Sequence, residues 1–223
     1  GTAVLHVNPT RTGFTFYQWS LDSEPFDLST PITGNIVLVA DWTYTDIGGD
    51  TGDVTWSFDP TTETLTISGT GAMGDYDRDG NQRPPWYAYE KSIRYLVIES
   101  GVTYVGENNF CEMNHLISVT LPASVTSINT YGFMNSMNIV EVNVEDGGLE
   151  VEKGSMSNGC VAMHARVINT GTESTIAHAS VPGGALYYVT DGGEVYVVAA
   201  DITDDTLTFP NSLGGDSTYH IGS

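Results

Sequence analysis

An apolar pattern between positions 93 and 144 of the chain repeats itself with a fixed 23-residue step. Six positions of the first copy return in the second, where Ile93, Leu96, Ile98, Val102, Val105 and Phe110 are followed by Leu116, Val119, Leu121, Val125, Ile128 and Phe133. The opening trio returns once more as Ile139, Val142 and Val144. A unit of this length buries its apolar face only against its neighbours. We therefore predict a short solenoid in which each unit adds one strand to a parallel stack.

The repeat resembles the BspA-like leucine-rich repeat. The segments GVTYVGENNF (101–110) and LISVTLPASVTSINTYGF (116–133) follow the family's order of apolar strand, proline, Ser-Val-Thr-Ser-Ile and a closing Gly-Phe pair. The run from Thr55 to Thr103 resembles the leader that precedes such repeats. The position that the family often fills with Asn or Cys is Met113 in one copy and Ser136 in the next. The resemblance implies a mainly β leucine-rich-repeat solenoid in a secreted bacterial protein.

Residues 1–43 are predicted to be a separate, partial module. Two alternating β runs, one around Phe14 and Trp19 and one from Ile36 to Trp42, flank a Pro/Asp/Ser/Thr-rich loop. The phrases TPIT (30–33) and LVADW (38–42) resemble the second part of an internalin B-repeat, also called the Listeria-Bacteroides repeat, which is a β-grasp-like spacer. Only GTAVLHV precedes the motif, so the module is expected to be either truncated or completed by a non-native strand pairing. Trp19 and Trp42 are interpreted as core residues, with sugar stacking as the alternative.

The rest of the chain divides into three predicted segments. Residues 44–92 hold a Gly/Asp linker (44–53) and two alternating runs, 54–58 and 65–67, that predict a hairpin capping the solenoid. Residues 93–145 are the leucine-rich repeats. Residues 146–223 are predicted to hold an irregular β region, a hairpin turning at Asp191-Gly192-Gly193, and the start of a further leucine-rich repeat. In that last phrase Leu207, Phe209, Pro210 and Leu213 take the places of Val119, Leu121, Pro122 and Val125.

The strand pattern also predicts which side chains face away from the core. Because side chains alternate along a strand, core positions at Leu96 and Ile98 place their neighbours on the concave sheet. The outward set, with one pair from each copy of the repeat, is Tyr95, Val97, Ser118, Thr120, Glu141 and Asn143. The concave sheet is where solenoids commonly contact extended partners. This small, mildly acidic patch is the predicted ligand-binding face, with plain solvent exposure as the alternative.

The loop DYDRDGNQRPPWYAY carries the opening of a calcium-binding pattern. Asp75, Asp77 and Asp79 alternate before Gly80, which suits a turn that gathers oxygen ligands around a hard cation. The closing carboxylate of an EF-hand is absent, because its position is occupied by Trp86. The loop is therefore either a calcium site or a solvated acidic loop.

Other candidate chemistry is sparse. Cys160, His164 and His178 lack the close ligand pairs of a zinc site, and ordinary packing is favoured over metal binding or a thiol nucleophile. Cys111 and Cys160 are too few for a disulfide scaffold, so a bond between them and two separate thiols both stay open. No nucleophile elbow, phosphate loop or dinucleotide fingerprint occurs in the sequence. We therefore predict no enzymatic activity.

The amino-acid composition limits the kinds of partner that the chain can bind. The formal net charge is −21, with 7 basic against 28 acidic residues, which disfavours nucleic acid and anionic membranes. No apolar run approaches the roughly 18 residues of a membrane helix. The resemblance implies a non-catalytic module at the extracellular bacterial surface that adheres to proteins of a host, of its matrix or of other bacteria. The alternative is a calcium-assisted carbohydrate-binding module, suggested by twelve tyrosines, four tryptophans and the acidic loop.

Overall fold

The structure is a computed structural model that describes residues 8–11, 13–44, 47–78, 82–171, 173–203 and 206–221. The chain forms two compact units, Gly1–Ile47 and Gly48–Ser223, which are described separately. The described part of the chain contains no helix long and apolar enough to cross a membrane.

The first unit is a small antiparallel sheet. Its strands β1 (Phe14–Leu21), β2 (Glu24–Pro25) and β3 (Val39–Tyr44) are arranged in the order β2-β1-β3. Phe16 packs against Trp19 and Trp42, with ring centroids 5.4 and 5.9 Å apart. Both β runs are therefore present, although the second begins at Val39 and not at Ile36, and both tryptophans pack within the sheet. The likeness to an internalin B-repeat stays a prediction, and residues 1–7, which would begin that module, lie outside the described residues.

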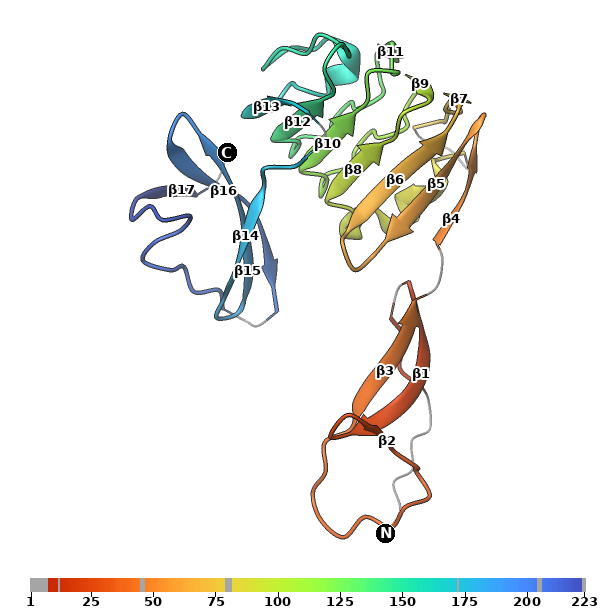
Figure 1. Cartoon of the computed structure of the whole chain (residues 1–223), viewed down its shortest axis with the longest axis vertical. Helices are drawn as coiled ribbons and strands as arrows, with labels where there is room; N and C mark the ends of the chain where they lie inside the picture. Colours follow the sequence, from red (N-terminus) through yellow and green to blue (C-terminus); the bar gives the residue numbers. More distant parts are fainter. Residues whose placement is uncertain are drawn as a thin grey trace. The chain divides into compact units, whose positions relative to one another are not determined.

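The second unit is a β-solenoid, as the regular spacing of the repeat predicts. Its main sheet, counted within the described residues, has seven strands in the order β13-β12-β10-β8-β6-β5-β4. Their bounds are β4 (Ile47–Thr51), β5 (Val54–Asp59), β6 (Thr64–Gly69), β8 (Tyr95–Ile98), β10 (Ser118–Leu121), β12 (Glu141–Val144) and β13 (Val167–Thr170). The strands from β6 to β13 pair in parallel (Figure 1). Leu65, Leu96, Val119, Val142 and Ile168 stand in register, one on each rung.

A second row of short parallel strands closes each turn. It consists of β7 (Gly71–Ala72), β9 (Val102–Val105) and β11 (Ser127–Ile128), paired in the order β11-β9-β7. The core between the rows holds an aromatic column in which Phe133 stacks on Phe110 at 5.0 Å and Phe110 stacks on Trp86 at 5.6 Å. Trp86 lies on the 3-10 helix η1 (Pro85–Ser92) and is fully buried. The repeated Phe of the sequence pattern therefore packs in the core of two successive turns.

The departure from the family pattern at Met113 and Ser136 has a structural explanation. Met113 is fully buried, and its backbone N–H donates to Ser136 Oγ at 3.0 Å. The Ser136 hydroxyl in turn donates to the Phe110 carbonyl. One buried hydroxyl therefore joins two backbone groups of the preceding turn, and a side chain smaller than Asn satisfies the turn.

The predicted hairpin cap is present, and the predicted linker before it is partly wrong. Strands β5 and β6 pair antiparallel from Val54↔Gly69 to Asp59↔Thr64, and β5 covers the edge of the first parallel rung. Ile47–Thr51, expected to be linker, forms β4 on the outer side of β5. Thr51 is buried and its hydroxyl accepts a hydrogen bond from Tyr76 at 2.9 Å, which fixes this segment to the solenoid.

Residues after 145 contain one more rung and a second sheet. The short 3-10 helix η2 (Asn158–Cys160) precedes β13, which pairs with β12 in the register Val142↔Ile168, a longer step along the chain than the one from Val119 to Val142. The chain then forms the C-terminal sheet, with β14 (Ala177–Val181), β15 (Gly184–Asp191), β16 (Glu194–Ile202) and β17 (Tyr219–Ile221) in that order (Figure 1). The hairpin at Asp191–Glu194 is confirmed.

The expected start of a further repeat at 207–213 is wrong. Leu213 is 3% exposed and belongs to a core cluster with Leu186, Val195 and Val197, and Leu207 packs against the same cluster. Strand β17, which follows, pairs with β16 and not with a solenoid strand. The apolar side chains of residues 207–213 pack in the core of the C-terminal sheet. This segment therefore resembles a repeat in sequence but adds no strand to the solenoid.

Candidate functional site

The six outward-facing residues predicted as a binding face do share one face of the solenoid sheet. Strand pairing places Tyr95 beside Ser118 and Ser118 beside Glu141, with the Val97, Thr120 and Asn143 row parallel to it. Four of these residues are nevertheless buried: Ser118, Thr120, Glu141 and Asn143 are 2%, 4%, 0% and 0% exposed. The expectation of an open patch is therefore wrong for these four, and Tyr95 and Val97 remain half-buried. Ligand binding by this face stays a prediction.

The segment that carries the chain from the solenoid to the C-terminal sheet helps to cover this face. We call residues 173–176 the strap. Its residues Ser174 and Thr175 bind the Glu141 carboxylate directly: Ser174 Oγ donates to Oε2 at 2.6 Å, and the Thr175 N–H donates to Oε1 at 2.6 Å. Thr175 Oγ1 donates to Oε1 as well, at 2.5 Å. Glu141 therefore fixes the strap over the sheet.

Further donors come from the sheet itself. Ser118 Oγ donates to Glu141 Oε2 at 2.6 Å, and the side-chain amides of Asn143 and Asn169 donate at 3.2 Å to Oε2 and Oε1. Burial disfavours the charged form of Glu141, but the hydrogen bonds from Ser118, Ser174 and Thr175 outweigh it and hold the pKa of this carboxyl below its ordinary value. The carboxylate is thus a structural anion at the centre of a polar network, and no donor of the network is left for a ligand.

A row of residues just before each strand joins the solenoid to the C-terminal sheet. Arg94, Ile117, Val140 and Arg166 precede β8, β10, β12 and β13 and are linked by backbone hydrogen bonds from one turn to the next. Ile117 and Val140 form a buried cluster with Val189 of β15. The two arginines lie at the ends of the row, and each guanidinium stacks on a tyrosine of the C-terminal sheet: Arg94 on Tyr187 at 4.6 Å and Arg166 on Tyr196 at 4.4 Å.

The Arg94 end of the row holds two carboxylates, although Arg94 Nε has no hydrogen-bond partner among the described residues. Arg94 Nε lies 3.2 Å from Glu63 Oε2, and Arg94 Nη2 pairs with Asp201 of β16. The Tyr187 hydroxyl lies 3.0 Å from Glu63 Oε2 and 2.8 Å from Asp201 Oδ2. Burial raises the pKa of Glu63 despite the opposing charge of Arg94, and burial together with hydrogen bonding to Asp201 raises the pKa of Tyr187. Sequence reasoning missed this cluster, because its partners are far apart in the chain.

The predicted face stays open beside Tyr95. A cleft of about 380 Å³ is lined there by Pro60, Thr61, Thr62, Glu63, Tyr95, His178 and Tyr187. Burial and then the nearby Glu63 carboxylate raise the pKa of Tyr95 to about 12, so its hydroxyl stays protonated at neutral pH. The cleft therefore presents aromatic surface and a protonated tyrosine hydroxyl.

The acidic loop is only partly described. Asp75 Oδ1 accepts the Glu107 N–H at 2.7 Å, and the Asp77 N–H donates to the Gln82 carbonyl at 3.0 Å, whereas Asp79 lies outside the described residues. Among the residues the structure describes, no three His, Cys, Asp or Glu side chains are grouped to hold a metal ion. Calcium binding by Asp75, Asp77 and Asp79 stays a prediction, and calorimetric titration with millimolar calcium tests it.

The two cysteines lie apart from these features. Cys111 is 5% exposed in the solenoid core, and Cys160 Sγ lies 3.6 Å from the Met156 carbonyl. No disulfide joins them in the described part of the chain.

These features define a β-solenoid module with a second sheet packed at one side. Residues 86–175 match the model of the BspA type leucine rich repeat region, in six copies. The match covers the solenoid from η1 to the strap and agrees with the resemblance found in the sequence.

Two solved structures are similar to the chain. A leucine-rich repeat protein from Eubacterium ventriosum is 18% identical over 69% of this chain and 48% of its own, with a TM-score of 0.37. A leucine rich cell surface protein from Faecalibacterium prausnitzii is 12% identical over 69% of this chain and 61% of its own, with a TM-score of 0.17. The chain thus spans about half the length of the first structure. A search of curated proteins gave no match.

Proposed function

We propose that the chain is a non-catalytic protein-interaction module of an extracellular bacterial surface protein, which adheres to proteins of a host, of its matrix or of other bacteria. The observation that carries the proposal is the in-register stack from Leu96 to Ile168, which lies within the segment similar to the BspA type leucine rich repeat region. A rigid stack of this kind presents an extended surface whose side chains are held in fixed positions, which suits a protein partner better than a small molecule.

Tyr95 and Val97 are the part of the predicted face that we propose contributes to binding. Both side chains are half-buried, and Tyr95 lines a cleft with Glu63, Tyr187 and His178. Tyrosine provides a large contact area together with a hydrogen-bonding tip, and it is enriched among the residues that dominate interface energetics.

The proposal is tested by measuring binding of the immobilised full chain to purified fibronectin, laminin and collagen and to suspended bacterial cells by biolayer interferometry. We expect saturable binding to at least one of these. A matched chain carrying Val142→Asp loses this binding, because a charge at a fully buried rung position disrupts the stack. Absence of saturable binding, or equal binding by the Val142→Asp chain, contradicts the proposal. A glycan array read with and without a chelator separates the carbohydrate alternative, which alone requires a chelator-sensitive glycan signal.

A further inference from the structure

The two arginines that end the row along the solenoid have the same aromatic support but different electrostatic surroundings. Arg94 on Tyr187 is paired with two carboxylates, Glu63 and Asp201. Arg166 on Tyr196 makes no ion pair with any carboxylate of the described residues. The nearby Glu194 accepts instead from the Tyr196 hydroxyl, at 2.6 Å. Within the described residues, the half-buried Arg166 guanidinium is therefore left without a carboxylate partner in a chain of net charge −21.

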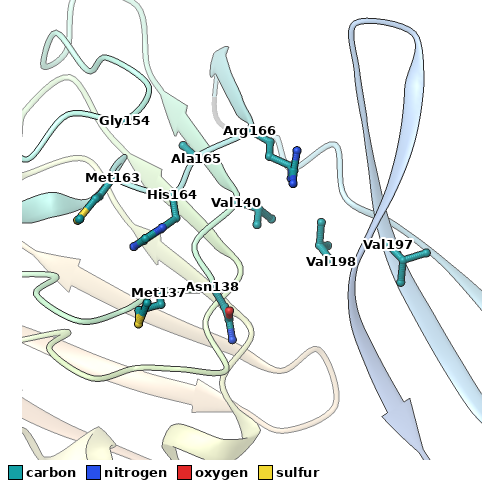
Figure 2. A pocket seen from close by; sticks show the side chains of 10 residues that line it. All are labelled: Met137, Asn138, Val140, Gly154, Met163, His164, Ala165, Arg166, Val197 and Val198. Atoms are coloured by element: carbon teal, nitrogen blue, oxygen red, sulfur yellow. The ribbon is translucent and has the colours of Figure 1, made fainter. Parts of the chain in front are cut away.

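Arg166 also lines the larger of two adjoining clefts. This cleft has a volume of about 680 Å³ and is lined by Met137, Asn138, Val140, Gly154, Met163, His164, Ala165, Arg166, Val197 and Val198. Figure 2 shows Met137, Met163 and His164 on the solenoid side of the cleft, Val197 and Val198 of β16 opposite them, and the Arg166 side chain reaching from the solenoid toward the C-terminal sheet. The volume lies within the usual range for ligand pockets, about 300–1,000 Å³.

The second cleft adjoins the first. It has a volume of about 120 Å³, shares Met137, Met163 and His164 with the larger one, and is also lined by Phe133 and Cys160. We call the two clefts together the Met-Arg groove. Met137 and Met163 are 58% and 41% exposed, although methionine is mostly a core residue. Methionine side chains are flexible and polarisable, and they are used at surfaces that bind varied apolar side chains of peptides.

We propose that the Met-Arg groove binds an extended peptide segment of a protein partner in which a carboxylate lies next to aliphatic side chains. The peptide carboxylate pairs with Arg166 and takes the place that Glu63 and Asp201 hold at Arg94. The aliphatic side chains contact Met137 and Met163. Charge complementarity decides the type of occupant. A basic peptide places a second positive charge beside Arg166, and an apolar peptide leaves the guanidinium without an ion pair.

This inference rests on the proposed protein-interaction function and assigns it a second site, which shares no lining residue with the cleft beside Tyr95. Peptide segments are the favoured class, since two adjoining clefts lined by exposed methionines and one guanidinium suit a chain that carries both apolar and acidic side chains. Arg binds a carboxylate through two parallel N–H donors, which adds geometric specificity to the attraction between the charges.

The test selects peptides from a random dodecapeptide phage library on the immobilised full chain. The selected peptides are then titrated against full chain labelled with ¹³C at the methionine methyl groups. The chain has six methionines, and Met73 and Met113, which are 3% and 0% exposed, serve as internal references. We expect selected peptides to be enriched in Asp or Glu beside Leu, Ile or Phe, and to shift the methyl signals of Met137 and Met163.

Matched variants separate the site from general charge effects. Arg166→Gln weakens binding of the selected peptides about tenfold or more, since a hydrogen-bonded charge is lost. Lys91→Gln removes one positive charge from an exposed position on η1 and leaves binding unchanged. Met163→Ala weakens binding, whereas Met156→Ala, at a 69% exposed methionine that lines neither cleft, does not.

Three outcomes overturn the inference. Peptides that bind without shifting Met137 or Met163, or with equal affinity for the Arg166→Gln chain, place the interaction elsewhere and leave the proposed function intact. Selection of basic peptides contradicts the assigned chemistry. Failure to select any peptide rejects the groove as a peptide-binding site. The proposed protein-interaction function is rejected as well only when the matrix-protein and cell-binding measurements are also negative.

Discussion

Replacing Glu141 with glutamine is expected to release the strap from the solenoid. The Glu141 side chain has no exposed surface, and each of its two oxygens accepts from three donors. A glutamine amide turns an NH₂ group toward one of these sets of donors. Hydroxyl groups can rotate away, but the Thr175 N–H and the side-chain amides of Asn143 and Asn169 are held in place. In either orientation of the glutamine side chain, its NH₂ group therefore faces at least one of these N–H donors.

The magnitude follows from the bonds that are lost. A hydrogen bond to a charged group contributes about 1.5–3 kcal/mol, and a buried donor left without an acceptor costs about 1–3 kcal/mol. For Glu141→Gln we expect a loss of about 3 kcal/mol, because part of the network can rearrange. In a unit of this size that corresponds to a fall in melting temperature of about 6–12 °C.

Hydrogen–deuterium exchange of the strap is the direct assay. The Thr175 amide donates to Glu141, so its exchange is expected to accelerate about 100-fold in Glu141→Gln, the factor that about 3 kcal/mol implies. Glu150→Gln removes the same charge from an exposed position and is the control, with an expected change within about 0.5 kcal/mol. An unchanged exchange rate at residues 173–176, with a melting temperature equal to that of the control, refutes the role of Glu141 in holding the strap.

Further predictions concern the solenoid core and its pH dependence. Phe133→Ala is expected to cost about 3–5 kcal/mol in urea unfolding, because it empties a buried position that stacks on Phe110. Ser136→Ala is expected to cost about 1–3 kcal/mol in the same assay, because the buried Met113 N–H loses its acceptor. The folded-state pKa of Glu141 is lowered from 4.5, so its contribution is complete above that value and disappears as the pH falls through the folded pKa. The stability gap between the native chain and Glu141→Gln is therefore full at pH 7 and narrows below about pH 4.5.

Each of these predictions has a contradicting result. A loss below about 1 kcal/mol for Phe133→Ala means that the aromatic column is not packed as described. An unchanged midpoint for Ser136→Ala means that the Met113 amide is satisfied by another acceptor. A stability gap that stays constant from pH 7 to pH 3.5 shows that the anionic form of Glu141 is not what binds the strap.

The sequence predicted the part of the fold that depends on regular spacing. Leu96, Val119 and Val142 recur at equal intervals and stand on consecutive rungs, because each turn has the same length and the same core position. The rung at Ile168 was missed, since additional residues before it make the step from Val142 longer than the preceding one. The signal that would have found it is the Val-Asn of 142–143 returning as Ile-Asn at 168–169, directly beside it in the sheet.

The closed face could not be predicted from alternation along the strands. Alternation shows that Ser118 and Glu141 point away from the core, which is correct, but it does not show what lies on the other side. That contact comes from Ser174 and Thr175, whose sequence indicates only a polar loop. The same limit applies to Arg94, whose partner Asp201 is 107 positions away in the chain. Such contacts depend on where the C-terminal sheet packs, and local pattern carries no information about it.

The claim on which the account depends most is that Leu96, Val119 and Val142 lie on successive rungs of one stack. Methyl–methyl NOE spectroscopy on chain labelled at leucine and valine methyl groups tests it directly. Adjacent parallel strands are about 4.8 Å apart, so strong cross-peaks are expected between Leu96 and Val119 and between Val119 and Val142. The Leu96–Val142 pair, at roughly twice that spacing, is expected to give a much weaker signal. Absence of the two strong cross-peaks, with Leu96 and Val142 methyls instead contacting unrelated residues, contradicts the solenoid.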